Sequence, residues 1–86
     1  MNPSPTPDDV ASRLNAALAA NGNSTFLHAL GEIVHSQGQA EIASASGLSL
    51  ETLAEELSPG GEPSFDTVRR VCRALGLRLV VQPLHA

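Results

Sequence analysis

The chain of 86 residues contains no tryptophan or tyrosine and only two phenylalanines, Phe26 and Phe65. Hydrophobic residues make up 42% of the chain and are mostly alanine, leucine and valine. A core of such small aliphatic side chains is more typical of packed helices than of an aromatic-rich sheet. A chain this short forms one domain and buries only about 60% of the surface of its unfolded state. We therefore expect a small helical domain that a second subunit would stabilise.

Lysine is absent: the five basic residues are all arginines, against nine acidic residues, and the net charge is −4. Non-specific binding to nucleic acid depends on a positive surface, because the release of phosphate counterions supplies most of its affinity. The overall charge therefore argues against a strong electrostatic binder of DNA or RNA. It favours a basic protein partner, because complementary charges steer encounter.

Cysteine is nearly absent as well, and the single Cys72 cannot form an internal disulfide, which is consistent with a reducing cytoplasm. Cys72 lies on an apolar helical stripe without a histidine at a neighbouring helical position, so it is expected to be inert packing. No apolar run approaches the roughly 20 residues of a membrane span, and the sequence MNPSPTPDD has no signal-peptide pattern. These features predict a soluble, cytoplasmic protein without a membrane partner.

Residues 41–57, EIASASGLSLETLAEEL, have the pattern of two short helices joined by a tight turn. Gly47 can adopt the positive φ that ends a helix, and Ser49 can cap the next one. The second helix would face the core with every third or fourth residue, Leu50, Leu53, Ala54 and Leu57. This is the outline of a helix-turn-helix motif at about residues 40–57, with an acidic outer face.

Three more helices are predicted around this motif. Residues 1–7, with three prolines, are expected to form a flexible arm. After it, Asp8 or Asp9 would cap a helix over residues 10–20, and Ser24 would cap a second one that ends near residue 37. Ser64 would cap the last helix, which Gly76 would end. The predicted buried stripes of these helices are Val10, Leu14, Ala17 and Leu18; Phe26, Leu27, Leu30, Ile33 and Val34; and Phe65, Val68, Val71, Cys72 and Leu75.

The sequence LRLVVQP near the C-terminus is short and rich in β-branched residues, so residues 77–82 are predicted to form a β-strand. A lone strand has unpaired edges. It would pair with its copy in a dimer, with another segment of this chain or with a partner protein. Residues 8–86 are thus predicted to form a single domain.

With this order of elements, the chain resembles the HigA-like addiction-module antidotes of the lambda-repressor-like (XRE) helix-turn-helix superfamily, over most of its length. The segments that carry the resemblance are residues 14–18 (LNAAL), Ala43, residues 47–49 (GLS), Leu53, residues 57–59 (LSP), residues 63–65 (PSF), residues 67–68 (TV) and residues 73–79 (RALGLRL). The resemblance implies an all-α, five-helix domain with a helix-turn-helix and a short C-terminal strand. It also implies a non-enzymatic cytoplasmic antitoxin without a cofactor, which binds a RelE/HigB-like toxin and, as a homodimer, binds operator DNA to repress its own operon.

The candidate DNA-binding residues lie mainly in the second helix of the motif, whose N-terminal part would enter the major groove. Serine and threonine there can donate to phosphates or base edges, glutamate can accept from a cytosine amino group, and leucine can contact a thymine methyl. The start of the last helix can hold a phosphate by its dipole. The candidate set is Ser49, Leu50, Glu51, Thr52, Glu55, Ser64, Arg69 and Arg70.

The charge of the motif leaves an alternative open. Between residues 36 and 57 there are four glutamates and no lysine or arginine, and a glutamate facing a phosphate is repulsive. Arg69, Arg70 and Arg73 are the nearest basic residues along the chain; they contact either phosphate or a second subunit, or they lie in solvent with Asp66 paired to Arg70. The alternative function is a degenerate helix-turn-helix that contacts proteins and does not bind DNA in a sequence-specific way.

An enzyme is a third class, for which the sequence offers little chemistry. His28, Glu32 and His35 share one helical face, and Glu32 with His35 matches half of a carboxylate-bundle metal motif. The second motif and the further carboxylates of such a site are missing, so no metal site is predicted. No nucleophile with a neighbouring base is visible, and no catalytic residue is assigned.

Overall fold

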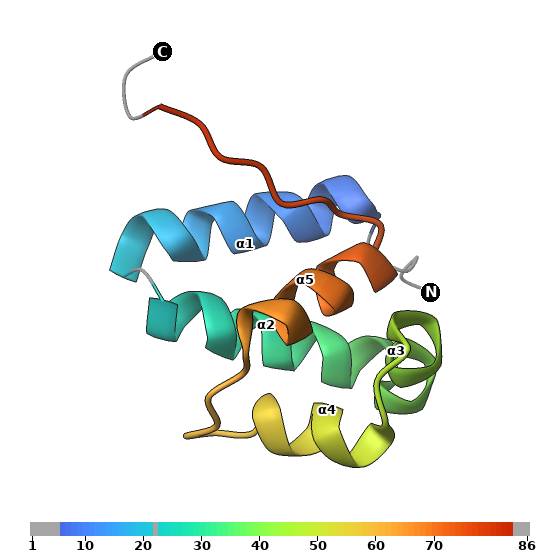
Figure 1. Ribbon diagram of the computed structural model, residues 1–86. Coiled ribbons are helices and arrows are strands. Elements are labelled where there is room, and N and C mark those ends of the chain that lie inside the picture. Colours follow the sequence, from blue (N-terminus) through green and yellow to red (C-terminus); the bar gives the residue numbers. More distant parts are fainter. Residues whose placement is uncertain (1–5, 22, 84–86) are drawn as a thin grey trace.

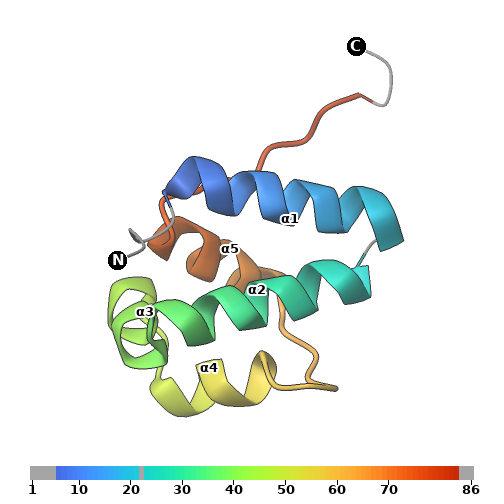
Figure 2. The ribbon, with the colours of Figure 1, turned by 180° about the vertical axis from the view of Figure 1, so that it is seen from behind.

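The structure, a computed structural model, describes residues 6–21 and 23–83. These residues form the helices α1 (Pro7–Asn21), α2 (Asn23–Gln37), α3 (Gln39–Ser46), α4 (Leu50–Glu56) and α5 (Phe65–Ala74). Helices α1 and α2 pack side by side, and α3 packs against α2, α4 and α5 (Figures 1 and 2). Helix α4 lies on the side of the domain opposite α1. The all-α prediction is confirmed for the described residues.

The core consists of small aliphatic side chains from all five helices. Leu30, Leu53 and Val71 are fully buried, and Leu53 is the residue through which α4 is anchored, because it is the buried residue of that helix. The complete set of buried hydrophobic residues is Val10, Leu14, Ala17, Ala29, Leu30, Ile33, Val34, Ile42, Ala43, Leu53, Val71, Cys72 and Leu75.

Helix α1 begins earlier than predicted, at Pro7, and neither Asp8 nor Asp9 is its N-cap. The Thr6 hydroxyl accepts a hydrogen bond from the Asp9 backbone N–H, and the Asp9 carboxylate accepts one from the Thr6 N–H, both at 3.2 Å. This reciprocal pair is a capping box. Proline suits the first helical position because its missing N–H would be unpaired there in any case. The first helix therefore starts at the last residue of the predicted arm, and residues 1–5 of that arm lie outside the described residues.

The sequence predicted Ser24 as the N-cap of the second helix. Helix α2 instead starts at Asn23, so Ser24 lies inside its first turn and is not its N-cap. The predicted N-caps of the last two helices are confirmed: Ser49 accepts a hydrogen bond from the Thr52 N–H at 3.0 Å, and Ser64 accepts one from the Thr67 N–H at 3.1 Å. The C-cap of α5 is Leu75, and Gly76 follows it with φ of 84°. Because such caps satisfy backbone groups next to them in sequence, they are readable from local patterns.

Three predicted core residues are instead exposed: Leu18 at 47%, Leu50 at 49% and Phe65 at 73%. Each lies at the margin of its stripe, and Leu50 and Phe65 are the first residues of α4 and α5. The helical period places such residues on the correct side of a helix, but it does not show where the neighbouring helix ends. These residues lie beyond the edge of the core.

The predicted C-terminal β-strand is not formed: residues 77–83 have no regular secondary structure and extend past α1 (Figures 1 and 2). Leu77 is half-buried, and its N–H donates to the Cys72 carbonyl at 2.8 Å. Beyond it, Leu79, Val80 and Val81 are 42%, 65% and 100% exposed. A strand needs a neighbouring strand for its backbone hydrogen bonds, and the described part of this single chain provides none.

We expect Ser49→Ala to lower the free energy of unfolding by about 1 kcal/mol, because the Ser49 Oγ is the N-cap of α4. Its oxygen accepts from the Thr52 N–H at 3.0 Å, and alanine would leave that donor without its partner. Ser44→Ala is the matched control, since Ser44 is exposed within α3. Urea denaturation followed by circular dichroism measures both changes; equal midpoints for the two variants would show that the cap contributes nothing.

Candidate functional site

Helices α3 and α4 are joined by a tight turn that fixes their relative orientation. Gly47 has φ of 78°, and the N–H groups of Gly47 and Leu48 both donate to the Ala43 carbonyl, at 3.1 and 3.2 Å. The buried Ser46 hydroxyl donates to the same carbonyl and accepts from the Leu48 N–H. A side chain at position 47 would need this strained φ and would also meet the Arg70 guanidinium. We refer to residues 39–56 as the α3–α4 unit.

The outer surface of α4 carries the predicted DNA-contact residues. Ser49, Leu50, Glu51 and Glu55 are exposed, and Thr52 is half-buried. The Ser49 hydroxyl is already used within the cap, since it also donates to the Thr52 Oγ1 at 2.9 Å. The serine is therefore held by its own helix, whereas Leu50 and Glu51 project from the first turn without such a contact.

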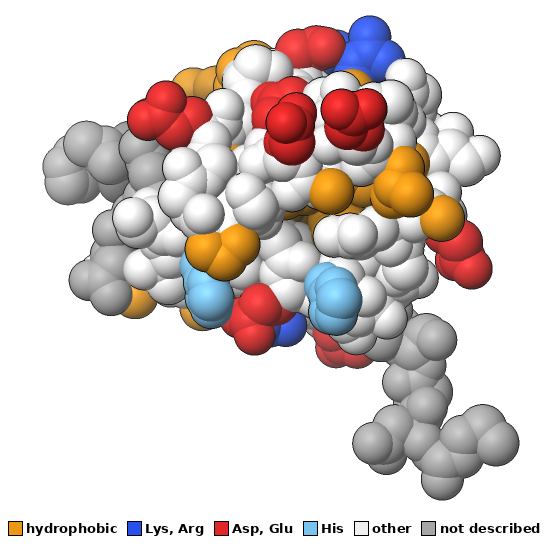
Figure 3. All heavy atoms as spheres, turned by 90° about the horizontal axis from the view of Figure 1, so that it is seen from below, with side chains coloured by type: hydrophobic (Ala, Val, Ile, Leu, Met, Phe, Trp, Pro, Cys, Tyr) orange, Lys and Arg blue, Asp and Glu red, His pale blue; other side chains and the backbone are white. Residues whose placement is uncertain are grey.

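The exposed charge over the α3–α4 unit is acidic. Glu41, Glu51 and Glu55 are exposed there, and Figure 3 shows acidic side chains spread over this face of the molecule with basic ones only at its margins. No lysine or arginine occurs in the unit to neutralise them. The surface as it stands repels phosphate and attracts cationic groups.

Glu56 has a structural contact that local sequence patterns do not reveal. Its Oε1 accepts a hydrogen bond from the Ser64 backbone N–H at 2.9 Å, which ties the end of α4 to the start of α5. The dipole of α5 is the basis for the predicted phosphate contact at Ser64. The carboxylate already supplies a negative charge at this helix N-terminus.

Three of the five basic residues lie on α5. Arg70 donates from Nε to the Asp66 carboxylate at 2.8 Å, which confirms the predicted pair, and from an Nη atom to the Ser46 carbonyl at 3.3 Å. This second contact links α5 to the end of α3 and was not predicted. Arg69 and Arg73, which precede and follow Arg70 in the sequence, are exposed. Together the three arginines line a shallow cavity beside the α3–α4 turn.

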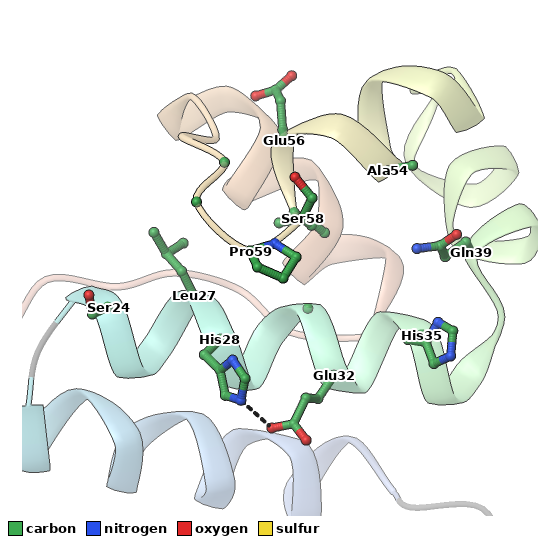
Figure 4. Close-up of a pocket in the computed structure, with 14 residues that line it drawn as sticks. Ser24, Leu27, His28, Glu32, His35, Gln39, Ala54, Glu56, Ser58 and Pro59 are labelled. Atoms are coloured by element: carbon green, nitrogen blue, oxygen red, sulfur yellow. Dashed lines mark ion pairs between the residues drawn. The ribbon is translucent and has the colours of Figure 1, made fainter.

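A groove of about 770 Å³ lies between α2 and the loop after α4 (Figure 4). Helix α2 and the loop approach closely, because a Cβ on Gly31 would lie 3.0 Å from the Leu57 carbonyl oxygen. The loop also folds back on the end of α4, because a Cβ on Gly61 would lie 2.5 Å from the Glu56 carbonyl oxygen. Leu27 and Pro59 contribute apolar surface to the groove. Sequence patterns did not single out this groove, since its two walls come from separate segments.

The histidine face of α2 forms one side of this groove. Glu32 is bound there by Arg13 of α1 at 3.1 Å and by His28 at 3.2 Å, whereas His35 lies near the Gln39 end (Figure 4). Among residues 6–21 and 23–83, no group of three histidine, cysteine, aspartate or glutamate side chains is arranged to hold a metal ion. Glu32 thus has a structural contact that joins α1 to α2.

Cys72 is 1% exposed within α5. Burial raises the pKa of its thiol, because the thiolate would lose its hydration. A nucleophilic cysteine needs the opposite shift, so the interpretation of Cys72 as a packing residue fits its surroundings. Over the part of the chain that is described, no helix has the length and hydropathy needed to cross a membrane.

Comparisons with known proteins identify the family of this chain. A curated protein of Haemophilus influenzae, described as uncharacterized, is 36% identical over 75 residues, which make up 87% of this chain and 77% of the relative. No solved structure matches the chain. Residues 5–83 match the family described as "Probable addiction module antidote protein". The chain therefore belongs to the addiction-module antidote family, whose members are named for an antitoxin role.

Proposed function

We propose that this protein is the antitoxin of a toxin–antitoxin module in the cytoplasm, where it neutralises a RelE/HigB-like ribonuclease toxin and represses its own operon as a homodimer. The observation that carries the proposal is the family match, which extends over all of the described residues. An antidote acts by binding a toxin. An acidic protein with a net charge of −4 suits a toxin that binds RNA through a basic surface.

The DNA-binding part of the proposal is supported by the geometry of the α3–α4 unit. The turn at Gly47 and the cap at Ser49 present the first turn of α4 to solvent, as in a helix-turn-helix that enters the major groove. Leu50 is 49% exposed although it is hydrophobic, and on this interpretation it contacts a thymine methyl. Ser49 and Thr52 would complete the contact at the start of α4, with Ser64, Arg69 and Arg70 at α5. Glu51 and Glu55 lie on the same exposed face of α4 and would repel the phosphates.

The C-terminal segment supports the dimer or the toxin contact. Leu79, Val80 and Val81 expose β-branched and aliphatic surface on an extended segment. Pairing with a strand of a second copy, or with an edge strand of the toxin, would satisfy the backbone groups and cover these side chains. In either case the strand that pairs with the C-terminal segment belongs to another molecule and not to the same chain.

A second candidate function is a helix-turn-helix that contacts proteins and not DNA. The observation that favours it is the exposure of Glu41, Glu51 and Glu55 on a unit without any basic residue. On this alternative, α4 would bind a cationic surface of the partner protein. The two candidates differ in whether the chain binds its promoter.

A titration of promoter DNA distinguishes the two candidates. Fluorescence anisotropy with a duplex from the protein's own promoter, over a range of salt, is measured with and without the product of the adjacent gene. The antitoxin–repressor proposal expects saturable binding at low salt, with a shallow dependence on salt because few cations contact phosphate. No binding at low salt in either condition, together with a stable complex between the two proteins on size exclusion, would favour the protein-contact alternative.

A further inference from the structure

The cavity beside the α3–α4 turn has a lining that differs from the rest of this acidic molecule. It has a volume of about 430 Å³ and is lined by Ala45, Ser46, Arg69, Arg70, Arg73 and Ala74. Three of the five basic residues of the chain lie on its wall, and no acidic residue is among its lining residues. Positive potential is therefore concentrated here, in a protein whose net charge is −4.

We propose that this arginine cavity binds a backbone phosphate of nucleic acid, so that DNA contacts the edge formed by α5 and the end of α3 and not only the outer face of α4. The inference rests on the proposed DNA-binding function and specifies where its phosphate contacts lie. It adds Arg73 to Arg69 and Arg70 as a residue that contacts phosphate.

The central arginine of the cavity is held in place before any ligand arrives. Arg70 is fixed at one end by Asp66 at 2.8 Å and at the other by the Ser46 carbonyl at 3.3 Å. A guanidinium with a fixed orientation loses less conformational entropy on binding, and its planar array of donors matches the oxygens of a phosphate. Asp66 occupies the Nε side of Arg70 and does not line the cavity.

The two outer arginines supply the charge for the phosphate. Arg69 and Arg73 are one helical turn apart on α5, where like charges repel each other and destabilise the helix. Within residues 6–21 and 23–83, the ion pairs formed by arginine involve Arg13 and Arg70, and neither Arg69 nor Arg73 takes part in one. An anion between them would remove this repulsion. The neighbouring side chains, Ala45, Ser46 and Ala74, are small and leave the guanidinium groups accessible.

The location of the cavity favours nucleic acid over an acidic protein segment. A Cβ placed on Gly47, in the turn that leads into α4, would lie 3.3 Å from an Nη atom of Arg70. The cavity therefore adjoins the same α3–α4 unit that is proposed to contact DNA. Because the outer face of α4 is acidic (Figure 3), the phosphates that flank the major groove need a basic contact elsewhere, and α5 provides it.

Charge-matched variants of the full-length protein test this inference. Arg69→Gln, Arg73→Gln and Arg13→Gln each remove one positive charge, and Arg13 lies on α1 away from the cavity, paired with Glu32. Anisotropy with promoter DNA is measured across salt for each variant. We expect Arg69→Gln and Arg73→Gln each to reduce the slope of log K against log salt by about one, and the double variant to lose at least tenfold in affinity at low salt. Arg13→Gln should keep the slope of the unsubstituted protein.

The outcomes separate this inference from the proposed function. If the unsubstituted protein binds promoter DNA and all three single variants share its slope, the cavity does not bind phosphate, although the repressor function stands. Polyglutamate and an unrelated duplex of equal charge are compared as competitors of the promoter DNA. If the two are equally effective, the cavity is a general acidic-peptide site, and the phosphate assignment is overturned. If the unsubstituted protein binds no DNA, alone or with its toxin, the repressor function fails together with this inference. Thermal unfolding followed by circular dichroism confirms that the variants, all at exposed positions, remain folded.

Discussion

Replacement of Leu53 by alanine is expected to lower the free energy of unfolding by about 2–5 kcal/mol, because the side chain is fully buried and its removal leaves a cavity. Leu53 is the buried residue of α4, so its loss also releases that helix from the core. A domain of this kind has a total stability of about 5–15 kcal/mol. We therefore expect the variant to lose a large share of its stability and to unfold at a clearly lower urea concentration, with the α3–α4 unit loosened most.

Leu50→Ala is the matched control on the same helix. Leu50 is 49% exposed, so its truncation should change the free energy of unfolding by no more than about 0.5 kcal/mol. Urea denaturation gives the free energy of unfolding of both variants. The rate at which the Cys72 thiol is labelled gives an independent measure of how often the domain opens. Because that thiol is buried and its pKa is raised, it reacts only when the domain opens. Equal labelling rates and equal urea midpoints for Leu53→Ala and the unsubstituted protein would contradict the packing described for α4.

Neutralising the outer face of α4 is expected to strengthen DNA binding. The double variant Glu51→Gln/Glu55→Gln removes two exposed negative charges from the surface that would face the phosphates. Each repulsion over a few ångströms in water costs about 1 kcal/mol, so the affinity for promoter DNA at low salt should rise by about tenfold or more. The rise should diminish as salt is added, because salt screens charges at the surface.

The same double variant also tests the protein-contact alternative. If the acidic face binds a basic surface of the toxin, Glu51→Gln/Glu55→Gln should weaken the toxin complex and leave DNA binding undetected. Asp8→Asn is a control for the overall charge, because Asp8 is exposed in the first turn of α1, outside the α3–α4 unit. If Asp8→Asn changes DNA affinity as much as a single Glu51→Gln does, the effect comes from net charge and α4 has no specific role.

The features that the sequence could predict are those that depend on residues close together in the chain. Gly47 and the caps Ser49 and Ser64 act within one helical turn, and the pair of Asp66 with Arg70 follows from helical spacing. The capping box at Thr6 is equally local, but the prolines around it obscured it, because proline also occurs in flexible segments.

Contacts between distant segments could not be predicted in this way. The hydrogen bonds from Arg70 to Ser46 and from Ser64 to Glu56 join different helices, and they determine the arginine cavity and the start of α5. The exposure of Phe65 depends on where the neighbouring helices end. A strand at residues 77–82 depends on a second strand, which the described part of one chain lacks, so its sequence pattern alone could not decide its structure.

The central claim, that this protein neutralises a toxin, is tested most directly by an RNA-cleavage assay with the purified product of the adjacent gene. The toxin is incubated with messenger RNA and increasing amounts of this protein, and the cleavage rate is followed. We expect cleavage to fall in proportion to the added protein and to stop at a stoichiometric ratio, with the two proteins eluting together on size exclusion. An unchanged cleavage rate at a large molar excess of the folded protein, without a complex, would contradict the antitoxin function.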